Sequence, residues 1–110
     1  MLSRKESKEA MERVQDPKSV NEKKRFSSIE GKQIGDALGI SWDRFDIDQF
    51  TMGLNVELEH GRKAPATDVT HDNPIVTGKI ALAHLNEFPD YYTRLAVMES
   101  EAERVKSARP

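Results

Sequence analysis

Four residues in this sequence have types and spacings that suit the binding of a divalent metal ion: Glu57, His60, His84 and Glu87. Each carboxylate lies three positions from an imidazole, which is about one turn along one face of a helix. Bundle proteins build metal sites from such helices facing each other, and these ligand types suit Zn²⁺, Mn²⁺ or Fe²⁺. The alternative needs no metal: an imidazolium at His60 is favourable at a helix C-terminus, and His84 is a core histidine bonded to Glu57 or Tyr91.

Other catalytic and ligand-binding patterns are incomplete. The same four residues suit acid–base chemistry in a hydrolase, but the sequence shows no nucleophile or oxyanion donor to accompany them. Segment 73–79 approaches a phosphate-binding loop, yet it begins with Asn73 in place of glycine and continues with Ile80 in place of Ser or Thr. The Asp and Thr residues of segment 61–73 are typical of turns, and their spacing does not match a calcium-binding EF-hand. The sequence therefore favours a protein that is not an enzyme and has no cofactor, with a bound divalent metal as the alternative.

The helix predicted for residues 73–88 has the clearest start and end in the chain. Asn73 is a good N-cap, Pro74 suits the first helical position, and Pro89 ends the helix. Apolar side chains cover nearly its whole circumference, and only Lys79 and Asn86 form a narrow polar strip. A helix of this kind is usually buried on several sides, so we expect the other segments to wrap around it.

Three further helices are predicted, the first from its caps and the other two from their caps and one apolar stripe on each. They span residues 27–38, 46 or 48 to 60, and 90–107, and the long connection 61–73 precedes the central helix. Because no useful alternation of period two occurs, the predicted fold class is all-α, a compact bundle of about four helices. Residues 26–110 form a single helical domain, and residues 1–25 form a charged arm that can itself become helical.

Composition excludes several classes of function. The chain of 110 residues has a formal net charge of −2, so it lacks the positive excess of nucleic-acid-binding proteins. Segment 34–41 resembles the start of a helix-turn-helix, but the next segment, 42–49, carries three aspartates and one arginine and would repel DNA. Cysteine, a signal-peptide pattern and an apolar run of membrane-spanning length are all absent from the sequence. We therefore expect no reading of DNA and no membrane contact.

Two aromatic residues are candidates for contact with a partner. Tyr91 falls in the apolar stripe of the last predicted helix, which leaves its neighbour Tyr92 as a surface anchor. Trp42 lies between two predicted helices and is the second candidate. Aromatic rings of this kind are enriched where one protein binds another.

Three segments of this sequence resemble those of a known family. They are GLNVELEHG at 53–61, DVT at 68–70 and TGKIALAHLNEFPDYY at 77–92. They are similar to a bacterial and phage family filed as domain of unknown function 5661, over about Ser27 to Glu103. The resemblance implies a small stand-alone domain, frequent in phage genomes, and it implies no particular activity.

The functional prediction joins these observations. A small core, an incomplete catalytic set and a charged arm on a compact domain favour a helical interaction module that binds another macromolecule. The partner is predicted to be a protein, and association of the chain with itself is left open. An accessory protein of a virion or of its assembly, and an inhibitor of a host system, both fit this prediction, which places the protein in a host cytoplasm or in a virion. The alternative function is metal binding, with or without hydrolase activity, at Glu57, His60, His84 and Glu87.

Overall fold

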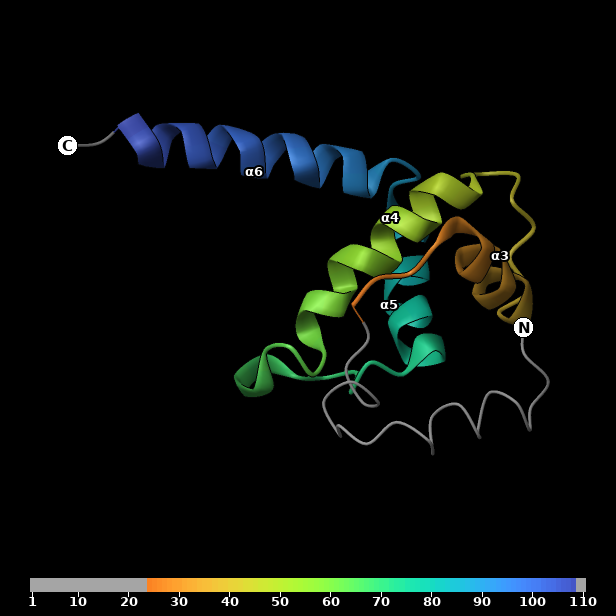
Figure 1. The fold of residues 1–110 in the computed structure, drawn as a ribbon. Coiled ribbons are helices and arrows are strands. Elements are labelled where there is room, and N and C mark those ends of the chain that lie inside the picture. The colour runs from red at the N-terminus through yellow and green to blue at the C-terminus, as the bar shows by residue number, and fades with distance from the viewer. Residues whose placement is uncertain (1–23, 109–110) are drawn as a thin grey trace.

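Helices account for all regular secondary structure in the part of the chain that the computed structural model describes, residues 24–108 (Figure 1). Their order is α3 (Ser28–Ala37), α4 (Ile47–Glu57), η1 (Leu58–His60), η2 (Pro65–Thr67), α5 (Pro74–Glu87) and α6 (Tyr91–Ala108), where η1 and η2 are short 3₁₀ helices. This arrangement confirms the predicted all-α bundle of four α-helices. The predicted N-terminal arm falls outside the described residues, apart from its last two positions.

Short-range signals set the starts of three helices where they were predicted, whereas α4 ends at Glu57, before the predicted end at His60. The Ser27 hydroxyl accepts a hydrogen bond from the Glu30 amide, and the Glu30 carboxylate accepts one from the Ser27 amide, which completes the capping box of α3. Asp46 caps α4 by accepting from the amide of Gln49. Asn73 caps α5 through two backbone amides, with proline at the first helical position.

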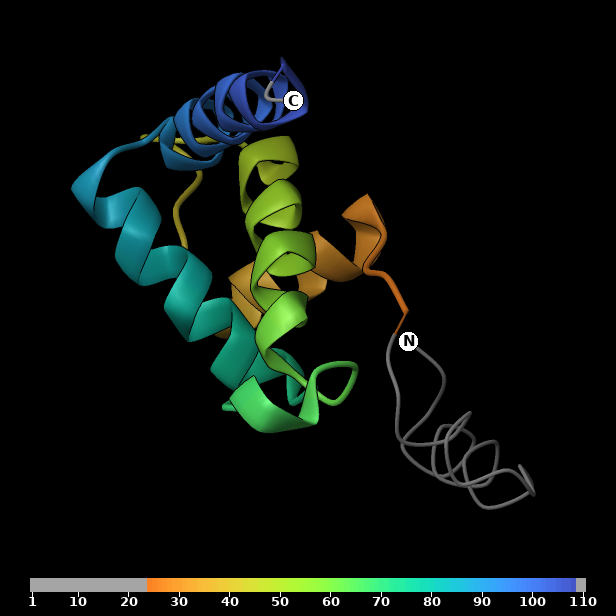
Figure 2. The same ribbon diagram turned by 90° about the vertical axis from the view of Figure 1, so that its left-hand side faces the viewer.

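The central element of the bundle is α4, which contacts α3, α5 and the start of α6 (Figure 2). It contributes two side chains to the core, and η1 directly after it contributes a third; the core consists of Phe26, Ile34, Phe45, Phe50, Leu54, Leu58, Ala81, Leu85 and Tyr92. Gly31 lets α3 approach α4 closely, because a β-carbon at that position would overlap the hydroxyl of Thr51.

The expectation that α5 is wrapped on all sides was wrong. It buries a single face, and Ile75 and Val76 on the other side are 39% and 38% exposed. The cause lies in the arrangement of the neighbours: α3 and α4 cover one face of α5, and α6 departs from the bundle before it can cover another. An apolar circumference shows which faces a helix can bury, but not which of them a neighbour covers.

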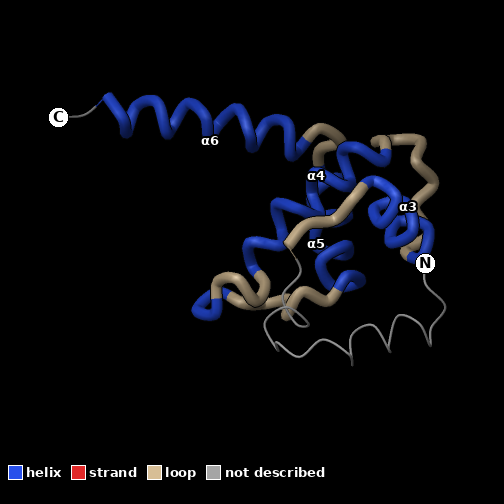
Figure 3. The backbone as a smooth tube through the Cα atoms, viewed as in Figure 1, coloured by secondary structure: helices blue, strands red, loops and turns tan. Residues whose placement is uncertain are grey.

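The last helix projects from the rest of the fold. Figure 3 shows α6 extending beyond the other helices as one long, uninterrupted segment. Its first residues contact α4 and α5, whereas every described residue after Leu95 is exposed. Within residues 24–108, the structure has no helix that combines the length and the apolar character needed to cross a membrane.

Candidate functional site

A buried polar cluster joins three of the helices at the centre of the fold. Glu57 is the last residue of α4 and is 5% exposed, His84 belongs to α5, and Tyr92 belongs to α6 and is 1% exposed. The Tyr92 hydroxyl donates to Oε2 of Glu57 at 2.6 Å, and Nδ1 of His84 lies 3.0 Å from that hydroxyl oxygen and 3.2 Å from the same carboxylate oxygen. Because the single phenolic proton points to Glu57, we assign a proton to Nδ1 of His84, which then donates to the cluster.

The electrostatics of this cluster keep the phenol protonated. Burial raises the pKa of Tyr92 well above its ordinary value, and the hydrogen bond to the Glu57 carboxylate raises it further. The Tyr91 ring stacks on the His84 ring with centroids 4.4 Å apart and planes 4° from parallel. The arrangement therefore holds α4, α5 and α6 together through contacts among the Tyr92 hydroxyl, Oε2 of Glu57 and Nδ1 of His84.

Two of the four predicted metal ligands lie outside this cluster. His60 is exposed in η1, and Glu87 is exposed at the last position of α5. Tightening of the backbone into a 3₁₀ turn directly after Glu57 takes His60 off the helical face that it was predicted to share. Across residues 24–108, no three His, Cys, Asp or Glu side chains lie close enough together to hold a metal ion. The structure pairs His84 with Glu57, one of the two partners predicted for it, and adds Tyr92 as the bridge.

The two predicted aromatic anchors are placed differently from the prediction. Tyr92 is buried and Tyr91 is half-buried, so the assignment of Tyr92 to the surface was wrong. Gly53 is the reason, because its missing side chain leaves room for the tyrosine: a β-carbon there would lie 2.5 Å from Cε2 of Tyr92. In the sequence, Gly53 and Glu57 are one turn apart on α4. This spacing was the signal that an aromatic ring can lie beside Gly53 with its hydroxyl at Glu57.

Trp42 closes one edge of the core. Its ring meets the rings of Phe45 and Phe50 edge-on, at centroid distances of 6.3 and 5.7 Å, and its Nε1 donates to Oδ1 of Asp36 at 2.9 Å. The backbone of Trp42 has a φ of 65°, which is an uncommon conformation for a large residue and is held by these contacts. Trp42 is therefore half-buried, with its ring committed to the core.

The connection between η1 and α5 is organised by side-chain caps. The carboxylate of Asp68 accepts from the amide and ring nitrogen of His71, and the carboxylate of Asp72 accepts from the amide of Arg62. His71 and Asp72 both have positive φ angles, 52° and 62°, as tight turns require. These contacts confirm that the Asp and Thr residues of this segment serve turn formation.

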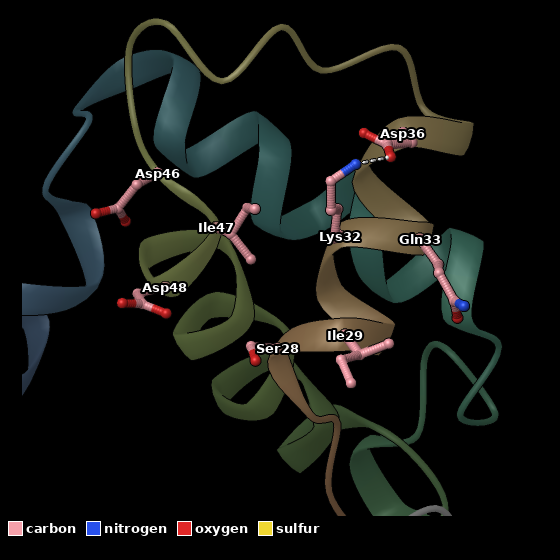
Figure 4. A pocket seen from close by; sticks show the side chains of 8 residues that line it. All are labelled: Ser28, Ile29, Lys32, Gln33, Asp36, Asp46, Ile47 and Asp48. Carbon is pink, nitrogen blue, oxygen red and sulfur yellow. Dashed lines mark hydrogen bonds and ion pairs between the residues drawn. The ribbon is translucent and has the colours of Figure 1, made fainter.

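An open groove of about 650 Å³ lies between α3 and the first turn of α4 (Figure 4). Ile29 of α3 is 71% exposed there, and Ile47 of α4 is half-buried. Sequence reasoning missed this site, because Ile29 lies off the apolar stripe of α3 and the groove exists only where two helices meet. The residues that line it are Ser28, Ile29, Lys32, Gln33, Asp36, Asp46, Ile47 and Asp48.

Negative charge prevails around this α3–α4 groove. Three aspartates line it against one lysine, and Lys32 is already paired with Asp36 at 2.6 Å. The hydrogen bonds from Lys32 and from Nε1 of Trp42 lower the pKa of Asp36, which keeps that carboxyl ionised. Asp46 and Asp48 remain as the acidic side of the groove at the start of α4.

Fold and site together define a small all-α protein. It has a groove whose lining includes two isoleucines and three aspartates, and a polar cluster that joins three helices. The chain belongs to a family described as protein of unknown function (DUF5661), whose model matches residues 31–101. This match confirms the resemblance found in the sequence. No curated protein and no solved structure matches the chain.

Proposed function

We propose that this protein is a binding module without enzymatic turnover, and that it holds a segment of another protein in the α3–α4 groove. The observation that carries the proposal is Ile29, a large aliphatic side chain that is 71% exposed inside a groove with an acidic side. An aliphatic side chain gains free energy when a partner removes it from water, by about 25 cal/mol for each Å² covered. An apolar patch rimmed by polar residues is the usual character of such a contact surface.

The charge of the domain indicates the chemistry of the bound segment. Residues 26–110 contain nine Lys or Arg against fourteen Asp or Glu, which leaves a net charge of −5. Within the groove, Asp46 and Asp48 add a local negative field next to Ile47. A segment with one or two large apolar side chains flanked by Lys or Arg complements both features, and its positive charges also accelerate association.

Such a surface serves both roles that the sequence suggested. An accessory protein of a virion or of its assembly, and an inhibitor of a host system, each act by holding another protein. The incomplete catalytic set supports binding over turnover, since the Tyr92 hydroxyl, Oε2 of Glu57 and Nδ1 of His84 are in contact with one another.

The test is a selection from a display library of short random peptides, using the full chain as the target. Enriched peptides should share an aliphatic or aromatic residue next to Lys or Arg, and they should release at about 1 M salt, where the Debye length falls to about 3 Å. Ile29→Asp should reduce their binding roughly tenfold or more, because the apolar contact is lost and a charged carboxylate stands in its place.

The matched control is Val69→Asp, which makes a similar exchange at a side chain that is 67% exposed in the connection before α5. This variant should bind as the wild type does. Equal binding by Ile29→Asp, or no enrichment at all, contradicts the proposal. So does binding that appears only after residues 1–23 are removed, since the groove would then belong to the N-terminal segment of the same chain.

A further inference from the structure

Helix α6 carries an apolar seam with the spacing of a coiled coil. Tyr91, Leu95, Met98, Ala102 and Val105 follow one another at intervals of four, three, four and three residues. In heptad notation Leu95 and Ala102 occupy a positions, and the other three occupy d positions. The first two side chains are half-buried against the bundle, while Met98 and Val105 are 53% and 54% exposed. The seam therefore continues past the point where the bundle stops covering it.

The charged residues beside this seam are complementary between two copies of the helix. Arg94 and Glu101 occupy g positions, and Glu99 and Lys106 occupy e positions. In a parallel pair, each g residue faces the e residue that lies five positions later in the partner. Arg94, which is also paired with Asp90 of its own chain at 2.8 Å, then faces Glu99 of the second copy, and Glu101 faces Lys106, so that both contacts join opposite charges.

The antiparallel arrangement lacks this complementarity. When Leu95 lies opposite Val105 of the second copy, e positions face e positions and g positions face g positions. Glu99 then approaches Glu99, and Glu101 approaches Glu101, which is repulsive. Charge therefore selects the parallel pair.

The position of the bundle is compatible with a parallel pair. Tyr92 is an e residue and is buried, and the seam residues Tyr91 and Leu95 are half-buried against the same bundle, so at the start of α6 the bundle covers the e flank and the first turn of the seam. In a parallel pair with two-fold symmetry, the e flanks of the two helices lie on opposite sides of the seam. The two bundles are then on opposite sides as well, and α6 extends away from its own bundle (Figure 1).

We propose that two copies of this chain associate through α6 as a parallel two-stranded coiled coil. The interface is centred on Met98, Ala102 and Val105 and is flanked by the contacts of Glu101 with Lys106 and of Arg94 with Glu99. The part of the seam that the bundle leaves open, from Met98 to Val105, spans little more than one heptad, so the dimer is weak and forms and dissociates with protein concentration. This association is independent of the α3–α4 groove and leaves that groove open on each copy.

The first test is sedimentation velocity of the full chain over a concentration series, with helix content followed by circular dichroism. The wild type should pass from monomer to dimer as concentration rises. Met98→Glu should raise the dimer dissociation constant roughly tenfold or more, because it places two carboxylates in the seam. Ser100→Glu is the matched control, since it adds the same charge on the outer face of the same turn, and it should dimerise as the wild type does. A wild type that stays monomeric, or equal behaviour of the two variants, overturns the proposal.

The second test distinguishes the parallel register from other associations. Glu101→Lys should weaken the dimer by bringing two positive side chains together, and the exchange Glu101→Lys with Lys106→Glu should restore it. The chain has no cysteine, so Val105→Cys introduces a single thiol at a d position. A parallel pair brings the two thiols face to face and gives a disulfide-linked dimer on mild oxidation, whereas the antiparallel pair separates them by about 15 Å. Failure of the exchange to restore dimerisation, or of the thiols to link, rules out the parallel coiled coil.

Discussion

Replacing Tyr92 by phenylalanine removes one hydroxyl from the centre of the bundle and leaves the ring in place. That hydroxyl donates to the Glu57 carboxylate at 2.6 Å and lies 3.0 Å from Nδ1 of His84. Glu57 is 5% exposed, so water cannot easily replace the lost donor. The ring remains packed against Gly53, and the apolar area buried by the side chain is unchanged.

The expected cost follows from the kind of bond that is lost. A hydrogen bond to a charged group contributes about 1.5–3 kcal/mol, and leaving its buried partner without a donor adds to this. His84 stays within 3.2 Å of the carboxylate and compensates in part. We therefore expect Tyr92→Phe to lower the free energy of unfolding by about 2–3 kcal/mol. In a domain of this size, such a loss lowers the melting temperature by about 8–20 °C.

The assay is urea unfolding followed by far-ultraviolet circular dichroism, with the urea dependence of the unfolding free energy compared between variants. The control is Tyr91→Phe, which removes the hydroxyl of the neighbouring ring while keeping its stacking on His84. Its effect should stay within about 0.5 kcal/mol. If Tyr92→Phe is as stable as Tyr91→Phe, the cluster does not hold the helices together and the reasoning is refuted.

Three further predictions concern the same cluster. Gly53→Ala should cost about 1–3 kcal/mol in a thermal melt, because its methyl group meets the Tyr92 ring; a neutral result would show that the ring can move aside. The folded-state pKa of Tyr92 is raised above its ordinary value of 10.0, so its contribution is complete below pH 10 and is lost above it. Unfolding free energy should fall by up to about 1.4 kcal/mol per pH unit there, and less steeply in Tyr92→Phe. A chelator should leave the melting temperature unchanged, since Glu57 and His84 already bond to Tyr92; a lower value would favour a bound metal.

Local chemistry made the helix ends predictable. The caps at Ser27, Asp46 and Asn73 depend on side chains within three residues of the groups that they satisfy, so each is visible in a short stretch of sequence. The choice of central helix depends on long-range packing, and there the prediction was wrong. Gly31 and Gly53 allow α3 and Tyr92 to approach α4, which makes α4 and not α5 the centre.

Only part of each candidate site could be predicted, because the sites also depend on long-range packing. The pairing of Glu57 with His84 was anticipated, because each lies beside the apolar side chains that its helix was predicted to bury. The third member, Tyr92, was missed because heptad spacing favoured its neighbour for the core. The α3–α4 groove is a property of two helices meeting, and no single stretch of sequence encodes it.

The most direct test of the proposed function is an amide-resolved NMR titration of the ¹⁵N-labelled full chain with the peptide most enriched in the display selection. Binding in the α3–α4 groove predicts shift changes centred on Ile29, Lys32 and Ile47, with Val69 unaffected, and predicts that Ile29→Asp abolishes them. Changes centred on α6 or on the connection before α5, or changes that persist unaltered in Ile29→Asp, would contradict the assignment of this groove as the binding site.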